Sequence, residues 1–217
     1  MLRHLIELIK QKKKHYGSDL WKFTISGNVM ELFAVPSYEK DREKYRCSVI
    51  KIGQVMQALS LGIDENKINC HIQSFPSLEN SALVASIRVN NKKSPENISS
   101  HKSTEEISAQ NGWFQVLMSH ASDNQLALEE ITEAKFSDYE IDQDNGTRKW
   151  FVLSSGVDNP FTWLKIGYWN EMIYRSLVAD NQDLVIKTDF CTRNKPNPTL
   201  LPAKTRKYVQ AVVGLRV

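Results

Sequence analysis

The stretch KWFVLSSGVDNPFTWL, residues 149–164, carries a strand signal followed directly by a helix signal in this 217-residue chain. Residues 149–154 form a nearly continuous apolar run, which is typical of a strand inside a sheet that is covered on both faces. Asp158 follows as the predicted N-cap of a helix, and Pro160 suits the first turn of that helix. The stretch therefore predicts a strand, a short turn and a helix that starts just after Asp158.

The rest of the chain alternates between helical and extended patterns. Apolar residues recur at helical spacing in residues 2–14, 41–61, 124–136, 158–177 and 200–207. Strand patterns occupy residues 20–25, 29–35, 67–73, 82–89, 184–190 and 208–217. The first two strands flank Gly27 and Asn28, which predicts a hairpin. Asp41 is the expected N-cap of the second helix, and Gly62 is its expected stop. No internal repeat is evident, and the order predicts one mixed sheet with helices on its faces.

Residues 90–110 differ from their surroundings because they are polar and lack apolar periodicity. We expect a long loop there, of the kind that can cover a functional site. A domain boundary is not predicted at this loop, because each half of the chain looks short of the strands that its own sheet would need. The expected organisation is a single α+β domain over residues 1–217.

Composition and charge exclude several classes of protein. Hydrophobic residues make up 41% and charged residues 24% of the chain, which is ordinary for a globular protein and excludes wholesale disorder. The net charge is only +3, so nucleic acid is not an expected partner and a basic nucleic-acid-binding module is the least favoured function. No apolar run approaches the length of about 18 residues that a membrane span needs. The start of the chain lacks a secretory pattern, so we expect a cytoplasmic protein without a membrane partner.

Motifs that would define a reaction are absent from the sequence. No phosphate-binding glycine loop, nucleophile elbow or zinc-protease motif occurs. The five histidines are scattered, and no pair of cysteines has ligand spacing, so no metal site is predicted. Cys47, Cys70 and Cys191 are best explained as small apolar residues, and no catalytic acid or base can be nominated.

The lysine run at the end of the first helix is the most suggestive local feature. Lys12, Lys13 and Lys14 could hold a phosphate group as point charges, although a solvated helix end that complements the helix dipole is the simpler explanation. Trp21 follows shortly afterwards, and its indole could contact a flat cofactor or simply pack in the core. For Trp163 and Trp169, which lie on a helical stripe, core packing is expected.

Three stretches, residues 5–14, 21–62 and 152–167, follow one another as in a known group of flavoproteins. The first, LIELIKQKKK, is similar to an opening helix that runs into an Arg-Arg-Ser-x-Arg phosphate motif. The second resembles a tryptophan-containing strand, a hairpin and a helix with an Arg-Glu start. The third looks like a strand, an Asp-Asp-Pro turn and a Trp-Leu-x-x-Gly helix. Together they resemble the nitroreductase-like FMN-dependent flavoprotein superfamily, especially its divergent branch of latent-stage mycobacterial FMN-binding proteins.

This resemblance implies a nitroreductase-like α+β fold that dimerises and binds FMN at the dimer interface. It implies an FMN-dependent oxidoreductase, reduced by NADH or NADPH, that acts on a small or peptide-derived substrate. The partner would be a second copy or a related subunit. By position, Lys12, Lys13 and Lys14 would bind the FMN phosphate. Trp21 would occupy the position of the tryptophan that lies beside the flavin ring in the family's Asn-x-Gln-Pro-Trp segment.

One position of that segment suggests an alternative function. Asp19 stands where the family has the glutamine, and a carboxylate beside a flavin opposes its reduction to an anion. The alternative is a catalytically degenerate relative, which would serve as a partner subunit or bind a flavin without turning it over.

Overall fold

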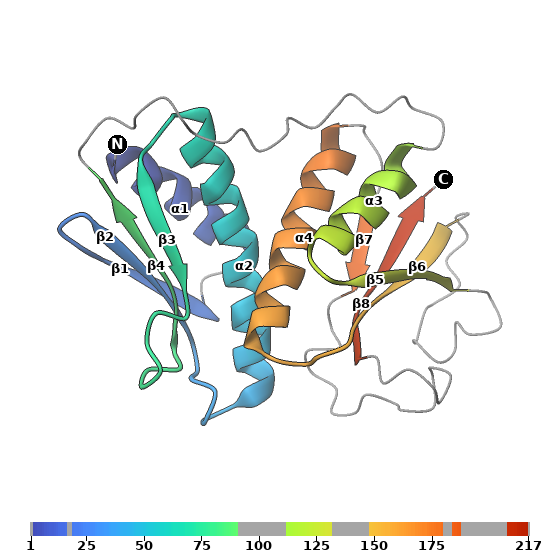
Figure 1. The fold of residues 1–217 in the computed structure, drawn as a ribbon, viewed down its shortest axis with the longest axis horizontal. Coiled ribbons are helices and arrows are strands. Elements are labelled where there is room, and N and C mark those ends of the chain that lie inside the picture. Colours follow the sequence, from blue (N-terminus) through green and yellow to red (C-terminus); the bar gives the residue numbers. More distant parts are fainter. Residues whose placement is uncertain are drawn as a thin grey trace. The chain divides into compact units, whose positions relative to one another are not determined.

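The fold repeats one order of elements. The computed structural model describes residues 2–16, 19–90, 112–131, 148–179, 184–187 and 208–216. These residues form four helices and eight strands in the order α-β-β-α-β-β, followed by the same order again (Figure 1). The elements are α1 (Leu2–Tyr16), β1 (Trp21–Ser26), β2 (Val29–Ala34), α2 (Arg42–Glu65), β3 (Cys70–Ser74), β4 (Leu83–Val89), α3 (Gly112–Asp123), β5 (Ala127–Ile131), β6 (Arg148–Ser155), α4 (Pro160–Ala179), β7 (Leu184–Lys187) and β8 (Tyr208–Arg216).

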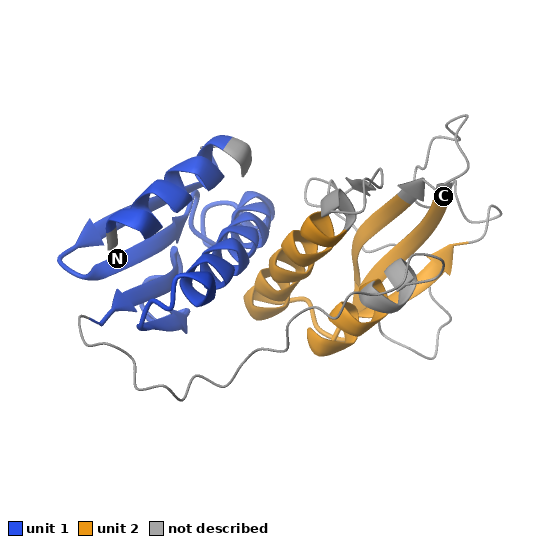
Figure 2. Cartoon of the chain, turned by 90° about the horizontal axis from the view of Figure 1, so that it is seen from above, with its two compact units in different colours: residues 1–106 blue, residues 107–217 orange. Residues whose placement is uncertain are grey.

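The chain divides into two compact units, residues 1–106 and residues 107–217 (Figure 2). Unit 1 contains sheet A, with the strand order β1-β2-β4-β3, and unit 2 contains sheet B, with the order β5-β6-β8-β7. All neighbouring strands in both sheets are antiparallel. The mixed α and β content is as predicted, but the prediction of one mixed sheet is wrong. The grouping of both units into a single domain stays a prediction.

The two sheets share an irregularity as well as an order. The register of β2 against β4 shifts between Leu32 and Phe33, and the register of β6 against β8 shifts between Leu153 and Ser154. In each case the shift falls just before the last two residues of the second strand of the unit. The described units are therefore topological repeats, which the sequence did not reveal because the repeat lies in the arrangement of the strands and not in their residues.

Unit 1 builds its core from one face of sheet A and the two helices. In β2, Met30, Leu32 and Ala34 are buried and alternate with partly exposed residues, as expected for a sheet that is covered on one face. Helix α2 packs against β1 and β2, and α1 packs against α2. Leu5 and Ile9 on α1 are fully buried, so the predicted amphipathic character of this helix is confirmed.

The predicted hairpin and second helix are present, with one correction. Gly27 has a φ of 58° in the turn between β1 and β2, a conformation that glycine adopts without strain. Helix α2 continues past the predicted stop at Gly62 and ends at Glu65. Gly62 lies inside the helix, where the Cδ2 atom of Leu8 would stand 2.7 Å from an added Cβ. The glycine therefore permits the close approach of α1 to α2.

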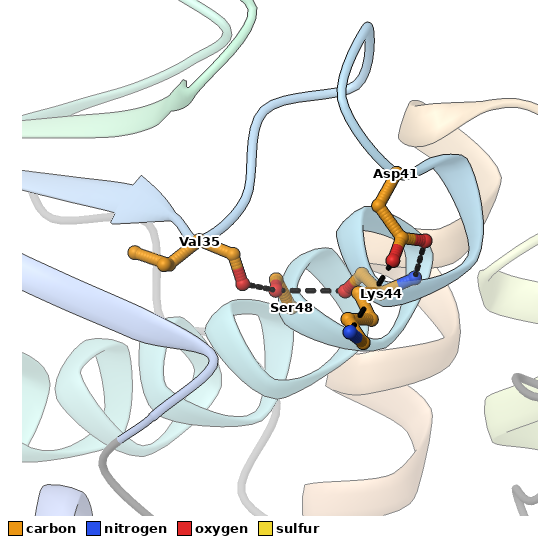
Figure 3. Close-up of polar contacts among 4 residues, drawn as sticks. All are labelled: Val35, Asp41, Lys44 and Ser48. Carbon is orange, nitrogen blue, oxygen red and sulfur yellow. Dashed lines mark hydrogen bonds and ion pairs between the residues drawn. The ribbon is translucent and has the colours of Figure 1, made fainter.

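The start of α2 is fixed by the predicted cap. Asp41 Oδ1 accepts a hydrogen bond of 3.0 Å from the backbone N–H of Lys44, and the Lys44 ammonium lies 3.5 Å from Asp41 Oδ2 (Figure 3). One turn further on, the buried Ser48 hydroxyl lies 2.8 Å from the Lys44 carbonyl oxygen and 3.0 Å from that of Val35. The contact with Val35 ties the end of the β2 strand to the helix.

We expect Asp41→Ala to lower the melting temperature at neutral pH, because the Lys44 N–H loses its acceptor. That backbone hydrogen bond holds the pKa of Asp41 below its ordinary value of 3.8. A lowered folded-state pKa stabilises the fold above the unfolded-state pKa, and this stabilisation is lost as the pH falls through the folded-state value. The difference in melting temperature between the wild type and Asp41→Ala should therefore shrink below pH 3.8.

The control variant is Asp41→Asn, which keeps a capping oxygen but carries no charge. It should melt close to the wild type at neutral pH. An Asp41→Ala variant that melts like the wild type at neutral pH would contradict the capping role.

Unit 2 departs from the sequence prediction at two elements. Residues 127–131, inside the predicted helix at residues 124–136, form strand β5, which pairs with β6; residues 132–136 lie outside the described part of the chain. Helix α3 at residues 112–123 was not predicted. Ala, Leu and Glu favour helices in isolation, but pairing along β6 outweighs that preference.

The other predictions in unit 2 are mostly confirmed. Strand β6 and helix α4 occupy the quoted stretch, and β7 and β8 match the last two predicted strands within the described residues. Asn159 caps α4 in place of the predicted Asp158, since its Oδ1 accepts a 2.9 Å hydrogen bond from the Thr162 N–H. Trp163 and Trp169 are buried, as expected. The predicted loop at residues 90–110, apart from its first residue, and the predicted helix at residues 200–207 lie outside the described residues.

Candidate functional site

The lysine run lies in the last turns of α1. Lys12 and Lys13 are half-buried, and Lys14 is exposed. Lys10, one turn earlier, forms an ion pair with Glu7 at 3.0 Å, and both side chains are exposed. The C-terminal end of a helix carries a partial negative charge, which the ammonium groups offset. Any anion bound here would therefore be attracted by the lysines alone and not by the helix dipole.

Lys13 lies against the aromatic side chains of β1. Its Nζ is 5.9 Å from the ring centroid of Trp21 and 5.7 Å from that of Phe23. The two rings have their centroids 6.5 Å apart and are tilted by 36°. A cation over an aromatic face is attracted by the ring quadrupole, with a gain of about 0.5–2 kcal/mol that depends on burial. The structure thus brings together Lys13 and Trp21, two of the residues proposed from the sequence.

Phe23 was not among the residues proposed from the sequence, although a signal for it existed. Residues two apart on a strand point to the same face of the sheet, so Phe23 must share the face of Trp21. Both rings therefore face the end of α1 that carries Lys13.

Trp21 itself is fully buried, and its indole nitrogen is unusual. The exposed fraction of the side chain is 0%, so the tryptophan has the packing role that was the alternative to cofactor contact. Yet Nε1 has no hydrogen-bond partner among the described residues. A buried donor without an acceptor costs about 1–3 kcal/mol, so a bound acceptor atom at this position would stabilise the fold.

Asp19 and Lys14 are the exposed members of the predicted set. Asp19 lies in the bend between α1 and β1, two residues before Trp21. Its carboxylate adds a negative charge to a region that is otherwise cationic. The other predicted site residues are three lysines and Trp21, and their ammonium and indole N–H groups are hydrogen-bond donors. A ligand that offers acceptors and negative charge would suit them.

The lysines and Trp21 fit the phosphate and the polar atoms of FMN better than they fit the flat face of its ring. Lys12 and Lys14 suit the phosphate, and Trp21 Nε1 suits an acceptor oxygen or nitrogen. The ring face of Trp21 does not suit a stacking role, because the side chain is fully buried in unit 1. The donor set therefore matches a phosphate-bearing ligand through charge and hydrogen bonds and not through stacking.

The third stretch of the resemblance, residues 152–167, takes part in a network of polar contacts with β8. Trp163 Nε1 donates to Asp158 Oδ1 at 2.6 Å, and Gln210 Nε2 donates to Ser155 Oγ at 2.8 Å and to Asp158 Oδ1 at 3.4 Å. The Ser155 hydroxyl donates to the Val157 carbonyl at 2.7 Å. These bonds fix the turn between β6 and α4. Gln210 could not have been found from the sequence, since it comes from the distant strand β8.

In the part of the chain that the structure describes, the other reactive side chains do not gather into a second site. Cys47 and Cys70 are half-buried and are not in a disulfide, and burial raises the pKa of the Cys70 thiol, which disfavours the reactive thiolate. Cys191 lies outside the described residues. Within the described ranges, no group of His, Cys, Asp and Glu could hold a metal ion. In the same ranges, no helix has both the length and the apolar character that crossing a membrane requires.

No protein-family model matches the chain, and the comparison with curated proteins gives no match. A function must therefore be argued from the residues at the end of α1 and the start of β1.

Proposed function

We propose that the chain is an FMN-dependent oxidoreductase of the nitroreductase-like superfamily, which acts on a small or peptide-derived substrate. The proposal includes a dimer or a complex with a related subunit, a cytoplasmic location, and NADH or NADPH as reductant. When bound, the flavin supplies the hydride and electron transfer. This chain supplies the binding groups: Lys12 and Lys14 for the phosphate, and Trp21 Nε1 for an acceptor atom of the ligand.

The contact of Lys13 with Trp21 and Phe23 carries this proposal. It places the ammonium of Lys13 over the ring of Trp21, whose indole N–H has no partner among the described residues. Successive residues of a helix are about 100° apart, so Lys13 is the lysine of the run that lies beside Trp21, and Lys12 and Lys14 point to its two flanks. A phosphate ester with a nearby acceptor atom is the kind of ligand that this group of donors can hold.

The binding test compares FMN with riboflavin, which lacks the phosphate. We expect the purified protein to bind FMN, and Lys14→Glu to weaken that affinity at least about tenfold, because a charge-assisted contact is lost and repulsion replaces it. Binding is measured by quenching of flavin fluorescence. Riboflavin affinity should be lower than that of FMN and nearly the same in both proteins.

The matched control is Lys40→Glu, which makes the same charge change at an exposed position of unit 1 outside the proposed site. It should leave FMN binding unchanged. A protein that stays colourless after incubation and refolding with FMN would refute the proposal.

Binding without turnover is the second candidate function, and the exposed carboxylate of Asp19 favours it. A negative charge near the ring would oppose formation of the anionic reduced flavin. The test is anaerobic bleaching of the bound flavin by NADH or NADPH. Steady turnover would exclude this candidate. Bleaching that occurs only in Asp19→Asn would support it.

A further inference from the structure

The start of α1 and the end of α2 are joined by a contact between His4 and Asn66. The side-chain nitrogen of Asn66, Nδ2, lies 3.1 Å from His4 Nε2 and 2.8 Å from the carbonyl oxygen of Gly62. The backbone N–H of Asn66 donates to the same Gly62 carbonyl at 3.2 Å. Asn66 is the C-cap of α2, so its side chain links that cap to α1.

The geometry fixes which group donates and which accepts in this contact. The Asn66 atom beside the Gly62 carbonyl must be the amide nitrogen, because a carbonyl oxygen accepts and cannot donate. An amide NH2 group has two hydrogens to donate and accepts none, so His4 Nε2 must be the acceptor of the second hydrogen. The imidazole in this contact is therefore neutral and carries its proton on Nδ1.

The contact lies beside the closest packing of the two helices. His4 and Leu8 are four residues apart, so they share a face of α1. The Leu8 side chain approaches Gly62 so closely that an added Cβ would stand 2.7 Å from Cδ2. Leu5 and Ile9 are fully buried and hold the rest of the helix in place. A change at His4 should therefore loosen the first turn of α1 and the cap of α2, and not the whole helix.

We propose that His4 and Asn66 form a pH-sensitive latch, which fastens the start of α1 to the end of α2 when the imidazole is neutral and releases it when the imidazole is protonated. Histidine is the side chain whose charge ordinarily changes between about pH 5 and 8. In the protonated ring both nitrogens are donors, so Nε2–H would face the Asn66 NH2 group, donor against donor. The latch is independent of the proposed function.

The charges around the latch come from both helices and partly cancel. The neighbouring charged residues are Arg3 and Glu7 on α1, and Asp64, Glu65 and Lys67 at the end of α2. All five are exposed, so water and salt screen their effect on the imidazole. The N-terminal end of α1 disfavours a cation and the C-terminal end of α2 favours one. The hydrogen-bond roles therefore decide the sign, and the stability from the latch is present at neutral pH and lost as the pH falls.

The experiment reads the latch by NMR of the full chain. At neutral pH, the ring nitrogen shifts should place the proton of His4 on Nδ1. The backbone N–H groups of Asn66 and Ile68 bond to carbonyls of the last turns of α2, and their hydrogen exchange reports the state of the cap. Between about pH 7.5 and about pH 5, where histidine takes up its proton, their protection factors should fall at least about threefold.

Two glutamine variants separate the latch from other effects of acid. In His4→Gln the side-chain oxygen can still accept from Asn66 but takes up no proton, so the protection factors should be the same at both pH values. His71→Gln makes the same change at another exposed histidine of unit 1 and should keep the full response of the wild type. A response that survives in His4→Gln, or disappears in His71→Gln, would overturn the proposal.

A third variant should reverse the response. Asn66→Asp replaces the donor with a carboxylate, which accepts from a protonated imidazole and stays ionised at about pH 5. Its cap should therefore be better protected at about pH 5 than at about pH 7.5, although weaker than the wild-type cap at neutral pH. The same sign of response as in the wild type would contradict the latch. A wild-type His4 with its proton on Nε2 at neutral pH would also refute it, whatever the variants do.

Discussion

Replacing Trp21 with alanine is expected to lower the free energy of unfolding by about 3–5 kcal/mol, the range for removing a large aromatic side chain from a core. Trp21 is fully buried at the start of β1, and the cavity left behind would lie beneath Lys13. The variant would also lose the attraction between the Lys13 ammonium and the indole ring. Urea denaturation followed by circular dichroism measures the change.

Trp21→Phe is the control that separates packing from hydrogen bonding. It keeps an aromatic face for Lys13 and removes the N–H that has no partner among the described residues. We expect a stability loss less than half that of Trp21→Ala, together with weaker FMN binding. An unchanged affinity for FMN in Trp21→Phe would contradict the proposed hydrogen bond, and a loss below about 1 kcal/mol in Trp21→Ala would contradict the core role.

Replacing Gly214 with alanine should destabilise unit 2 by about 1–3 kcal/mol, the usual cost of forcing extra volume into a packed core. Gly214 on β8 pairs with Trp150 on β6. An added Cβ would lie 2.6 Å from Cζ3 and 2.7 Å from Cη2 of the Trp150 ring. The ring is rigid and nearly buried, so relief requires a shift of the strand or of the tryptophan.

A second substitution tests the cause of that loss. Trp150→Leu shortens the side chain that the new methyl group would meet, so the double variant Gly214→Ala/Trp150→Leu should lose less stability than the sum of the single variants. A double-mutant cycle measures this coupling. Gly156→Ala is the matched control, because a Cβ there has no atom within 4 Å. Additive losses in the cycle would contradict the steric explanation.

Local signals in the sequence predicted much of the fold. The hairpin at Gly27, the cap at Asp41 and the strand-to-helix stretch around Pro160 each depend on residues close together in the chain. These elements are present in the structure with small differences in their bounds. The cap at α4 was assigned to the wrong neighbour, because Asp158 and Asn159 are both good caps and only the contact of Asp158 with Trp163 decides between them.

Long-range pairing was the part that the sequence could not supply. Residues 127–131 have helical composition, yet they lie along β6 as a strand, and Gln125 with a φ of 60° separates them from α3. The presence of two sheets follows from which strands pair, and no local pattern encodes that choice. Each half of the chain was expected to have too few strands for a sheet of its own. Sheets A and B have four strands each, and four strands are enough for a stable sheet when helices pack against it.

Part of the candidate site was predictable because its residues are close together in the chain. Lys12, Lys13, Lys14 and Trp21 are near one another in the sequence, so a contact such as that of Lys13 with Trp21 could be expected. The burial of Trp21 and the unpartnered state of its N–H depend on the packing of α1 and α2 over sheet A, which only the structure supplies.

The confinement of every described strand pair to one unit has a consequence for how the protein is made. Sheet A is complete once Val89 has left the ribosome, so unit 1 can fold during translation, before most of the second half has been synthesised. Its apolar strands then spend little time exposed to other nascent chains, which lowers the risk of aggregation at birth.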